Sequence, residues 1–283
     1  MNTLLKRSLS GAVYAALLIT SILCCKYSFL VFMLFAVAVM MHEFMRMTMQ
    51  DEYKMSQILT IIAGCILFAL VWAVRAFTAI TAKFCFLALI PVFVVMVNSL
   101  YVKEKKDFGK FANVYTALLY IALPFTIYNF LVMSPYGDYN GWLLLIFFLL
   151  IWASDTGAYM FGMALGQKFG GKLFPSISPK KSWIGFWGGF AVCLLASFVI
   201  YLTGSYQWAG LEDFSWYHAI LMAAVMNVTG VYGDLFESQW KRHYEVKDSG
   251  TIIPGHGGLL DRFDSAIFAI PAGMLYLVIF NFI

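Results

Sequence analysis

Long apolar runs separated by short polar stretches fill almost the whole chain. A helix needs about 20 apolar residues to cross roughly 30 Å of hydrocarbon. Runs of about this length occupy residues 8–25, 28–46, 57–74, 84–102, 112–133, 142–163, 183–202, 219–240 and 265–282. They are too long for membrane barrel strands, and backbone groups in lipid must be satisfied internally. The pattern therefore predicts an all-α polytopic membrane protein of about nine transmembrane helices.

No repeat or low-complexity linker divides these runs, so we predict a single transmembrane domain over residues 1–283. Within it, residues 1–133 form N-terminal helices, and residues 142–283 form catalytic helices and cytoplasmic loops. The first run follows a basic start, as in a signal peptide, but it continues to Cys25 without a small-residue cleavage site. We interpret it as a retained span.

Composition and charge support a bilayer as the solvent. The chain is 62% hydrophobic and 12% charged, whereas a soluble domain carries about 25% charged residues. The net charge of +4 comes from basic residues that form no continuous stripe, which argues against nucleic acid as a partner. The five cysteines lie within or beside apolar runs without metal-ligand spacing, and we interpret them as inert thiols.

The distribution of basic residues predicts the orientation. With a cytoplasmic N-terminus, most of the 19 Lys and Arg fall in inner loops, and Lys26, Arg75 and Lys83 remain outside. This asymmetry follows the positive-inside rule. The sequence thus predicts a cell (inner) membrane protein whose two long polar loops, 164–182 and 241–264, face the cytoplasm.

Carboxylates interrupt the apolar runs of the second half. An ionised residue near the bilayer centre costs about 2.5–3.5 kcal/mol, so each needs a reason. Asp155 and Asp234 lie about 20 and 22 Å from the outer ends of their predicted helices, and Asp264 begins the last run from the inner side. Three helices thus bring carboxylates to one level, and oxygen ligands of this kind suit Mg²⁺. We predict a shared site there.

Plainer interpretations of the same features stay open. Asp261 and Asp264 are also typical of a helix start, the stretch "GHGG" of a turn, and "SPKKS" of positive-inside sequence. His243 and His256 suit turn or interfacial positions better than metal ligation. We predict that Glu43 pairs with Arg46, three residues further along its helix, rather than binding a ligand.

The stretch "SQWKRHYEVKDSGTIIPGHGGLLDRFDS", residues 238–265, resembles the signature of phosphatidate cytidylyltransferases. The positions that match are Ser238, Lys241, Arg242, Lys247, Asp248, Gly250, Pro254, Gly255, His256, Gly257, Gly258, Asp261, Arg262 and Asp264. Upstream, "SDTGAYMFG", "SPKKSW" and "GDLFES" resemble further blocks of that family, in the same order. One departure is Ile184, which stands where many relatives carry an acidic residue.

The resemblance implies transfer of a cytidylyl group from CTP to phosphatidate, giving CDP-diacylglycerol and pyrophosphate. It implies Mg²⁺, with a second metal ion left open, bound by Asp155, Asp234, Asp261 and Asp264. The catalytic side chains would be Lys180, Lys181, Lys241, Arg242, Asp261 and Arg262. The nucleotide pocket would contain Ser178, Lys247, Asp248, Gly255, His256, Gly257 and Gly258. The resemblance also suggests a homodimer.

Features of the sequence disfavour two other functions and leave a third open. A cation- or proton-coupled transporter also uses intramembrane carboxylates, but it predicts inverted repeats, whereas the polar features here lie in one half. A CDP-alcohol phosphotransferase would carry D-G-x2-A-R-x8-G-x3-D-x3-D, and no such stretch occurs. A cytidylyltransferase acting on another lipid phosphate stays open.

Overall fold

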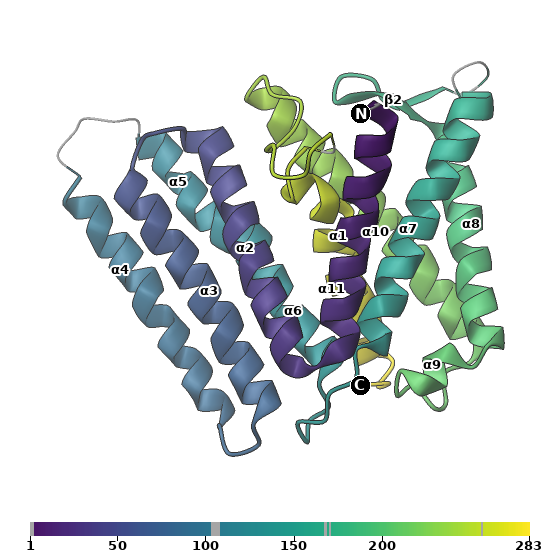
Figure 1. Cartoon of the computed structure of the whole chain (residues 1–283), viewed down its shortest axis with the longest axis horizontal. Helices are drawn as coiled ribbons and strands as arrows, with labels where there is room; N and C mark the ends of the chain where they lie inside the picture. The colour runs from purple at the N-terminus through teal and green to yellow at the C-terminus, as the bar shows by residue number, and fades with distance from the viewer. Residues whose placement is uncertain (1–2, 103–107, 167–168, 170, 256) are drawn as a thin grey trace. The chain divides into compact units, whose positions relative to one another are not determined.

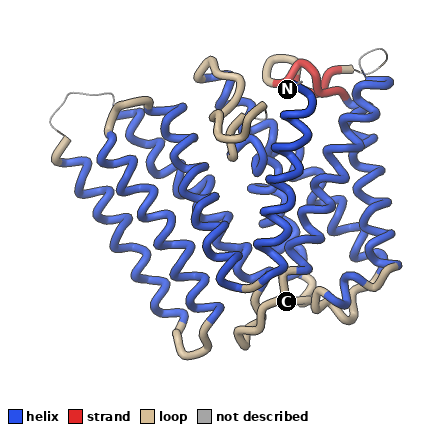
Figure 2. The backbone as a smooth tube through the Cα atoms, viewed as in Figure 1, coloured by secondary structure: helices blue, strands red, loops and turns tan. Residues whose placement is uncertain are grey.

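The structure is a computed structural model that describes residues 3–102, 108–166, 169, 171–255 and 257–283. Helices make up nearly all of this described part (Figure 2). Within it, eight helical spans are long and apolar enough to cross a membrane, and a shorter apolar stretch, Leu9–Cys24, belongs to α1 (Thr3–Cys24). The predicted all-α polytopic membrane fold is confirmed, with one small β-hairpin added.

The chain divides into two compact units, and the first contains residues Met1–Tyr139 and Tyr244–Arg262. Phe29, Phe44, Phe68, Phe111 and Phe125 are fully buried in it. Helix α2 packs against α1, α3 and α5, and α3 packs against α4 and α6 (Figure 1). The elements are α1, α2 (Lys26–Met49), α3 (Lys54–Ala76), η1 (Ala82–Ala88), α4 (Leu89–Leu100), α5 (Phe108–Ala117), η2 (Leu118–Ala122) and α6 (Leu123–Val132).

The second unit contains residues Asn140–His243 and Phe263–Ile283. Its elements are α7 (Trp142–Phe161), η3 (Gly162–Gly166), β1 (Lys172–Phe174), β2 (Ser178–Ser182), α8 (Trp183–Leu202), α9 (Ser205–Trp208), α10 (Trp216–His243) and most of α11 (Leu260–Ile279). Helices α7 and α8 lie so close together that a Cβ on Gly189 would be only 2.7 Å from the carbonyl oxygen of Ser154. Small residues permit such contact between membrane helices.

Two predicted runs differ from the observed elements. The run 112–133 is not one regular helix: α5 passes through the π-turn η2 into α6, which carries Pro124 in its first turn. Proline has no N–H to donate to the preceding turn, which suits such a local change of register. The run 265–282 begins earlier, because α11 starts at Leu260 and so includes Asp261 in its first turn.

The division into units adds something that the sequence did not predict. The first boundary falls between Tyr139 and Asn140, inside the gap expected between residues 133 and 142. The segment Tyr244–Arg262, however, groups with the N-terminal helices.

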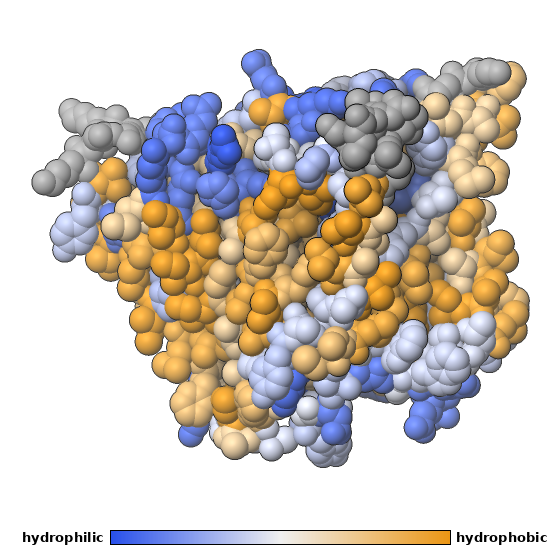
Figure 3. Space-filling model, viewed as in Figure 1, coloured by the Kyte–Doolittle hydropathy of each residue, from blue (hydrophilic) through white to orange (hydrophobic). Residues whose placement is uncertain are grey.

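Apolar side chains remain exposed along the helices. Figure 3 shows hydrophobic residues over the middle of the helices in view and hydrophilic residues at their ends. On η1 and α4, Phe86 and Leu100 are 73% and 81% exposed. A water-soluble surface rarely carries so large a continuous apolar area. The chain is therefore a multi-pass membrane protein whose exposed apolar side chains face lipid.

Candidate active site

The hairpin of the second unit directs one lysine toward α10. Strands β1 and β2 pair antiparallel, and the Ser182 hydroxyl then caps α8 by accepting from Gly185 N at 3.1 Å. Lys181 Nζ lies 2.5 Å from Asp234 Oδ2 on α10. Successive side chains of a strand point to opposite faces, and Lys180 is exposed. Lys181, one of the two predicted lysines, thus contacts the carboxylate of Asp234, and Ser178 begins the same strand.

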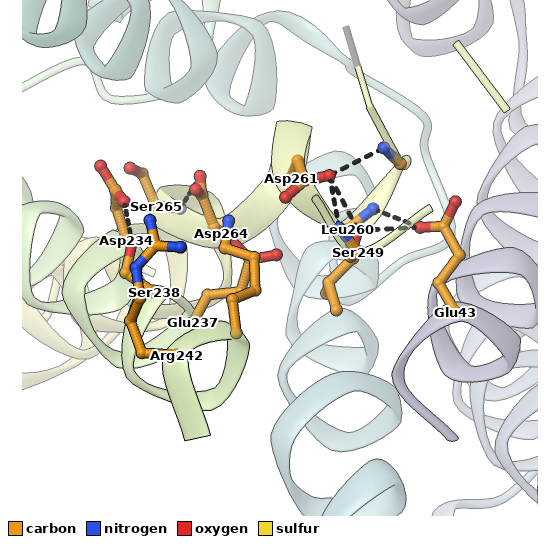
Figure 4. A network of polar contacts seen from close by, with 12 residues as sticks. Glu43, Asp234, Glu237, Ser238, Arg242, Ser249, Leu260, Asp261, Asp264 and Ser265 are labelled. Atoms are coloured by element: carbon orange, nitrogen blue, oxygen red, sulfur yellow. Dashed lines mark hydrogen bonds and ion pairs between the residues drawn. The ribbon is translucent and has the colours of Figure 1, made fainter. Parts of the chain in front are cut away.

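Glycines set the spacing between α10 and α11. A Cβ on Gly233 would lie 2.6 Å from the carbonyl oxygen of Asp264, so only glycine permits the two backbones to come this close. One residue further along α10 is Asp234, whose Oδ1 accepts from the Ser238 hydroxyl at 3.3 Å. Figure 4 shows Asp234 and Asp264 side by side. Two of the predicted metal ligands are thus brought together by helix packing.

Buried charges surround this pair. Glu237 is fully buried on α10, and its Oε2 accepts from Lys241 Nζ at 2.7 Å. Asp264 interacts electrostatically with the negative charges of Asp234, Glu237 and Asp155 and with the positive charge of Lys241. We call Asp155, Asp234, Glu237 and Asp264 the carboxylate cluster.

Of the other predicted site residues, Arg242 borders the cluster, and Asp155 is the member of the cluster that comes from α7. Arg242 Nε donates to the carbonyl oxygen of Ile177 at 3.2 Å, which ties the end of α10 to the hairpin. Asp155 on α7 lines a cavity of about 10 Å³ together with Ser154, Asn227 and Ser265. A space of this size is near the lower limit for one water molecule.

The carboxylate cluster offers oxygen ligands to a divalent cation. Among the described residues, no group of three or more His, Cys, Asp or Glu side chains is arranged to hold a metal ion. Mg²⁺ does not require such a cage, because it is commonly bound by one or two carboxylates with waters and substrate phosphates completing the octahedron. The adjacent carboxylates of Asp234 and Asp264 fit that mode of binding.

A second polar network lies in the first unit (Figure 4). Asp261 Oδ2 accepts from Ser249 N at 2.9 Å, from Ser249 Oγ at 3.0 Å and from Gly258 N at 2.7 Å. These bonds fold the segment before α11 back onto the first turn of that helix. Asp261 thus contacts this segment here, and its predicted role as a metal ligand stays a prediction.

The same segment forms an open pocket of about 430 Å³. Its lining includes five predicted site residues: Lys247, Asp248, Gly255, Gly257 and Arg262. Gly255 and Gly257 have φ values of 79° and 87°, a conformation that glycine adopts without strain. We call this space the basic loop pocket. His256 lies outside the described residues, and Gly258 is buried beside the pocket with its N–H donated to Asp261.

Three residues of these networks were not assigned to a site from the sequence. Glu237 lies three residues after Asp234 on α10, and a spacing of three places the two on one helix face. Ser249 stands in the signature segment between matched positions. Glu43 comes from α2, and the predicted pair with Arg46 is wrong: within the described part of the chain, its carboxylate accepts hydrogen bonds from Ser249, Leu259 and Leu260 instead.

Comparisons with known proteins identify the family of the chain. The chain is 35% identical over 195 residues to the phosphatidate cytidylyltransferase of Bacillus subtilis (strain 168), which covers 69% of this chain and 68% of that protein. The phosphatidate cytidylyltransferase of Staphylococcus aureus (strain COL) is 45% identical over 130 residues, 45% of this chain and 46% of that protein. The sequence model of the Cytidylyltransferase family matches residues 5–280. With nearly its whole length matched, the chain belongs to the cytidylyltransferase family.

Proposed function

We propose that this protein transfers the cytidylyl group of CTP to phosphatidate, giving CDP-diacylglycerol and pyrophosphate. Family membership over residues 5–280 and the Bacillus subtilis relative both support this reaction. The structural observation that carries the proposal is the ion pair of Lys181 with Asp234. It joins two sequence blocks, "SPKKSW" and "GDLFES", at the carboxylate cluster.

The nucleophile needs no general base. A phosphate monoester has its second pKa near 6, so the phosphatidate phosphate is largely ionised at neutral pH. One of its oxygens attacks the α-phosphorus of CTP. The bond from that phosphorus to the oxygen bridging to the β-phosphate breaks, and pyrophosphate leaves with the electron pair.

The main obstacle is repulsion between two anions, and the lysines beside the carboxylate cluster reduce it. Lys181 and Lys241 each lie within ion-pair distance of a carboxylate. Both ammonium groups are thereby held in place before a phosphate arrives, and preorganised cations of this kind stabilise charge in the transition state. Lys180, Arg242 and Arg262 supply further positive charge for the phosphates.

Bound Mg²⁺ would neutralise charge on the α-phosphate and on the departing pyrophosphate. Asp234 and Asp264 would hold it, with Asp155 contributing to the same site or to a second one. Asp261 is assigned to the same ligands by the resemblance, and its hydrogen bonds to Ser249 and Gly258 all use Oδ2. We assign the basic loop pocket to the phosphates of CTP, since Lys247 and Arg262 line it.

The location follows from the same proposal. CTP is cytosolic, so the carboxylate cluster and the basic loop pocket would be reached from the cytoplasm. The concentration of Lys and Arg in the predicted inner loops supports a cytoplasmic N-terminus in the cell membrane. A homodimer stays a prediction.

The reaction is tested with purified protein in micelles, radiolabelled CTP, Mg²⁺ and phosphatidate. We expect label in the lipid extract and an equal amount of pyrophosphate, with neither product when Mg²⁺ is omitted. Parallel reactions with isoprenoid phosphate test the other lipid acceptor. Nucleotide-independent cation uptake by proteoliposomes, without lipid labelling, would instead indicate a transporter.

A further inference from the structure

The N-terminal helices contribute a buried carboxylate to the segment that forms the basic loop pocket. Glu43 lies on α2 and is 5% exposed. Its Oε1 accepts from Leu259 N at 3.0 Å, and its Oε2 accepts from Leu260 N at 2.8 Å. These donors lie more than 200 residues away along the chain, yet each carboxylate oxygen accepts from one of them. Figure 4 shows Glu43 beside Leu260 and Ser249.

The two N–H groups lie at the start of α11. The first N–H groups of a helix have no partner within the helix, and they attract negative charge. A buried carboxylate is costly unless hydrogen bonds compensate for its lost hydration. The Glu43 carboxylate therefore accepts hydrogen bonds from the N–H groups at the start of α11, and these donors in turn compensate for its burial. Helix α11 is thus capped by a side chain of another helix, α2.

Ser249 links Glu43 to Asp261. Its hydroxyl lies 3.0 Å from Asp261 Oδ2 and 3.4 Å from Glu43 Oε2. A serine hydroxyl carries one proton, so the two carboxylates share this donor. The backbone N–H of Ser249 adds a bond to Asp261, and the segment is tied down from two sides.

The glycines of the signature fit closely around these carboxylates. A Cβ on Gly258 would lie 2.6 Å from Glu43 Oε2 and 2.7 Å from Gly250 N. A Cβ on Gly257 would lie 2.7 Å from Asp261 Oδ2. Gly250 and Gly257 also line the basic loop pocket. The wall of that pocket is thus built directly on Glu43 and Asp261.

We propose that Glu43 is a positioning residue for nucleotide transfer, acting by holding residues 248–255 and 257–260 in the conformation that forms the basic loop pocket. The inference rests on the proposed function in that it takes this pocket as the site of the CTP phosphates. Glu43 itself touches no reacting atom.

The test compares Glu43→Gln with Glu52→Gln. Glutamine keeps the shape but replaces one acceptor oxygen with an NH2 group that faces a backbone N–H. Glu52 is a matched control, because it also carries a negative charge in the first unit but pairs with Lys110 at 2.7 Å. We expect kcat/KM for CTP to fall about 10- to 100-fold in Glu43→Gln, through a higher KM for CTP and an unchanged KM for phosphatidate. Glu52→Gln should match the wild type.

Hydrogen exchange provides a readout that is independent of turnover. The amides of Ser249, Leu259 and Leu260 should exchange faster in Glu43→Gln than in the wild type or in Glu52→Gln. Unchanged exchange would overturn the inference. So would a loss of kcat with both KM values unchanged, since that is the result of a smaller folded fraction. If the wild type itself shows no lipid labelling, the proposed function fails, and exchange still tests the role of Glu43.

A milder variant keeps the test open if Glu43→Gln does not fold. Ser249→Ala removes the shared hydroxyl and leaves Glu43 with its two backbone donors. We expect a smaller rise in the KM for CTP than in Glu43→Gln, with an unchanged KM for phosphatidate. A wild-type KM for CTP in Ser249→Ala would contradict the proposal. Where Glu43→Gln also folds, the effect of the double variant should be less than the product of the two single effects.

Discussion

At the scale of single residues, the geometry separates side chains that the sequence treats alike. Lys180 and Lys181 are neighbours with the same charge, yet the strand alternation brings Lys181 to Asp234 and leaves Lys180 exposed. Glu43 and Glu52 are both acidic residues of the first unit, yet one caps α11 and the other pairs with Lys110. The type of a residue therefore indicates which roles its side chain can have, and the residue that it contacts in the fold decides which role it takes.

Replacing Lys181 tests the ion pair at the carboxylate cluster. Lys181→Met keeps the length of the side chain and removes the charge that reduces repulsion between the substrates. We expect kcat for lipid labelling to fall by about 100-fold or more, the size of effect produced by removing one preorganised hydrogen-bond donor from a transition state. Lys110→Met is the control, because Lys110 makes an ion pair of similar exposure with Glu52 away from the cluster. A loss of turnover in both variants alike would contradict a specific role for Lys181.

At the scale of elements, the contact between α10 and α11 determines whether the cluster forms. Asp234 and Asp264 belong to different helices, and they come together because Gly233 lets α10 approach the backbone of α11. A spacing of three residues within either helix describes only which face a carboxylate occupies. The position of the opposite helix follows from small residues at the crossing.

This contact is tested by Gly233→Ala. The added Cβ would lie 2.6 Å from the Asp264 carbonyl oxygen, which cannot move away without shifting α11. We expect a loss of about 1–3 kcal/mol of stability from overpacking, measured by thermal unfolding in micelles, and a clear loss of turnover. Gly230→Ala is a matched control one turn away, since its Cβ would lie 3.4 Å from the Ala269 Cβ, an ordinary contact. Equal effects of the two substitutions would contradict the importance of spacing at Gly233.

At the scale of the whole molecule, the segment Tyr244–Arg262 returns to the N-terminal helices although it follows α10 in the chain. The first unit is thus more than a membrane anchor, because α2 supplies the carboxylate on which the signature segment rests. Because Lys and Arg are concentrated in the predicted inner loops, this segment is predicted to face the cytoplasm.

Orientation is tested with a membrane-impermeant maleimide on vesicles of known sidedness. Cys24 and Cys25 are exposed at the junction of α1 and α2, which is predicted to face outward, so the wild type should label in right-side-out vesicles. Ser176 is exposed in the turn of the hairpin. In a Cys24→Ser, Cys25→Ser background, Ser176→Cys should label in inside-out vesicles only. The reverse pattern would contradict the cytoplasmic N-terminus.

The sequence by itself determined the class of fold, the approximate spans and most of the chemistry-bearing residues. Apolar runs of membrane length leave the backbone no alternative to helices, and charges in such runs are costly enough to indicate a site. Resemblance to the family signature then named the reaction.

Only the tertiary structure decided which of these residues meet. The site residues Lys181, Asp234 and Asp264 come from three separate elements, and their contacts depend on a strand register and on glycines at a helix crossing. From the sequence, Glu43 was predicted to pair with Arg46 because the two are three residues apart on one helix. Spacing along a helix gives no information about backbone N–H donors that a distant segment brings near. The partners of Glu43 became evident only in the folded chain, where the N–H groups at the start of α11 lie within hydrogen-bond distance of its carboxylate.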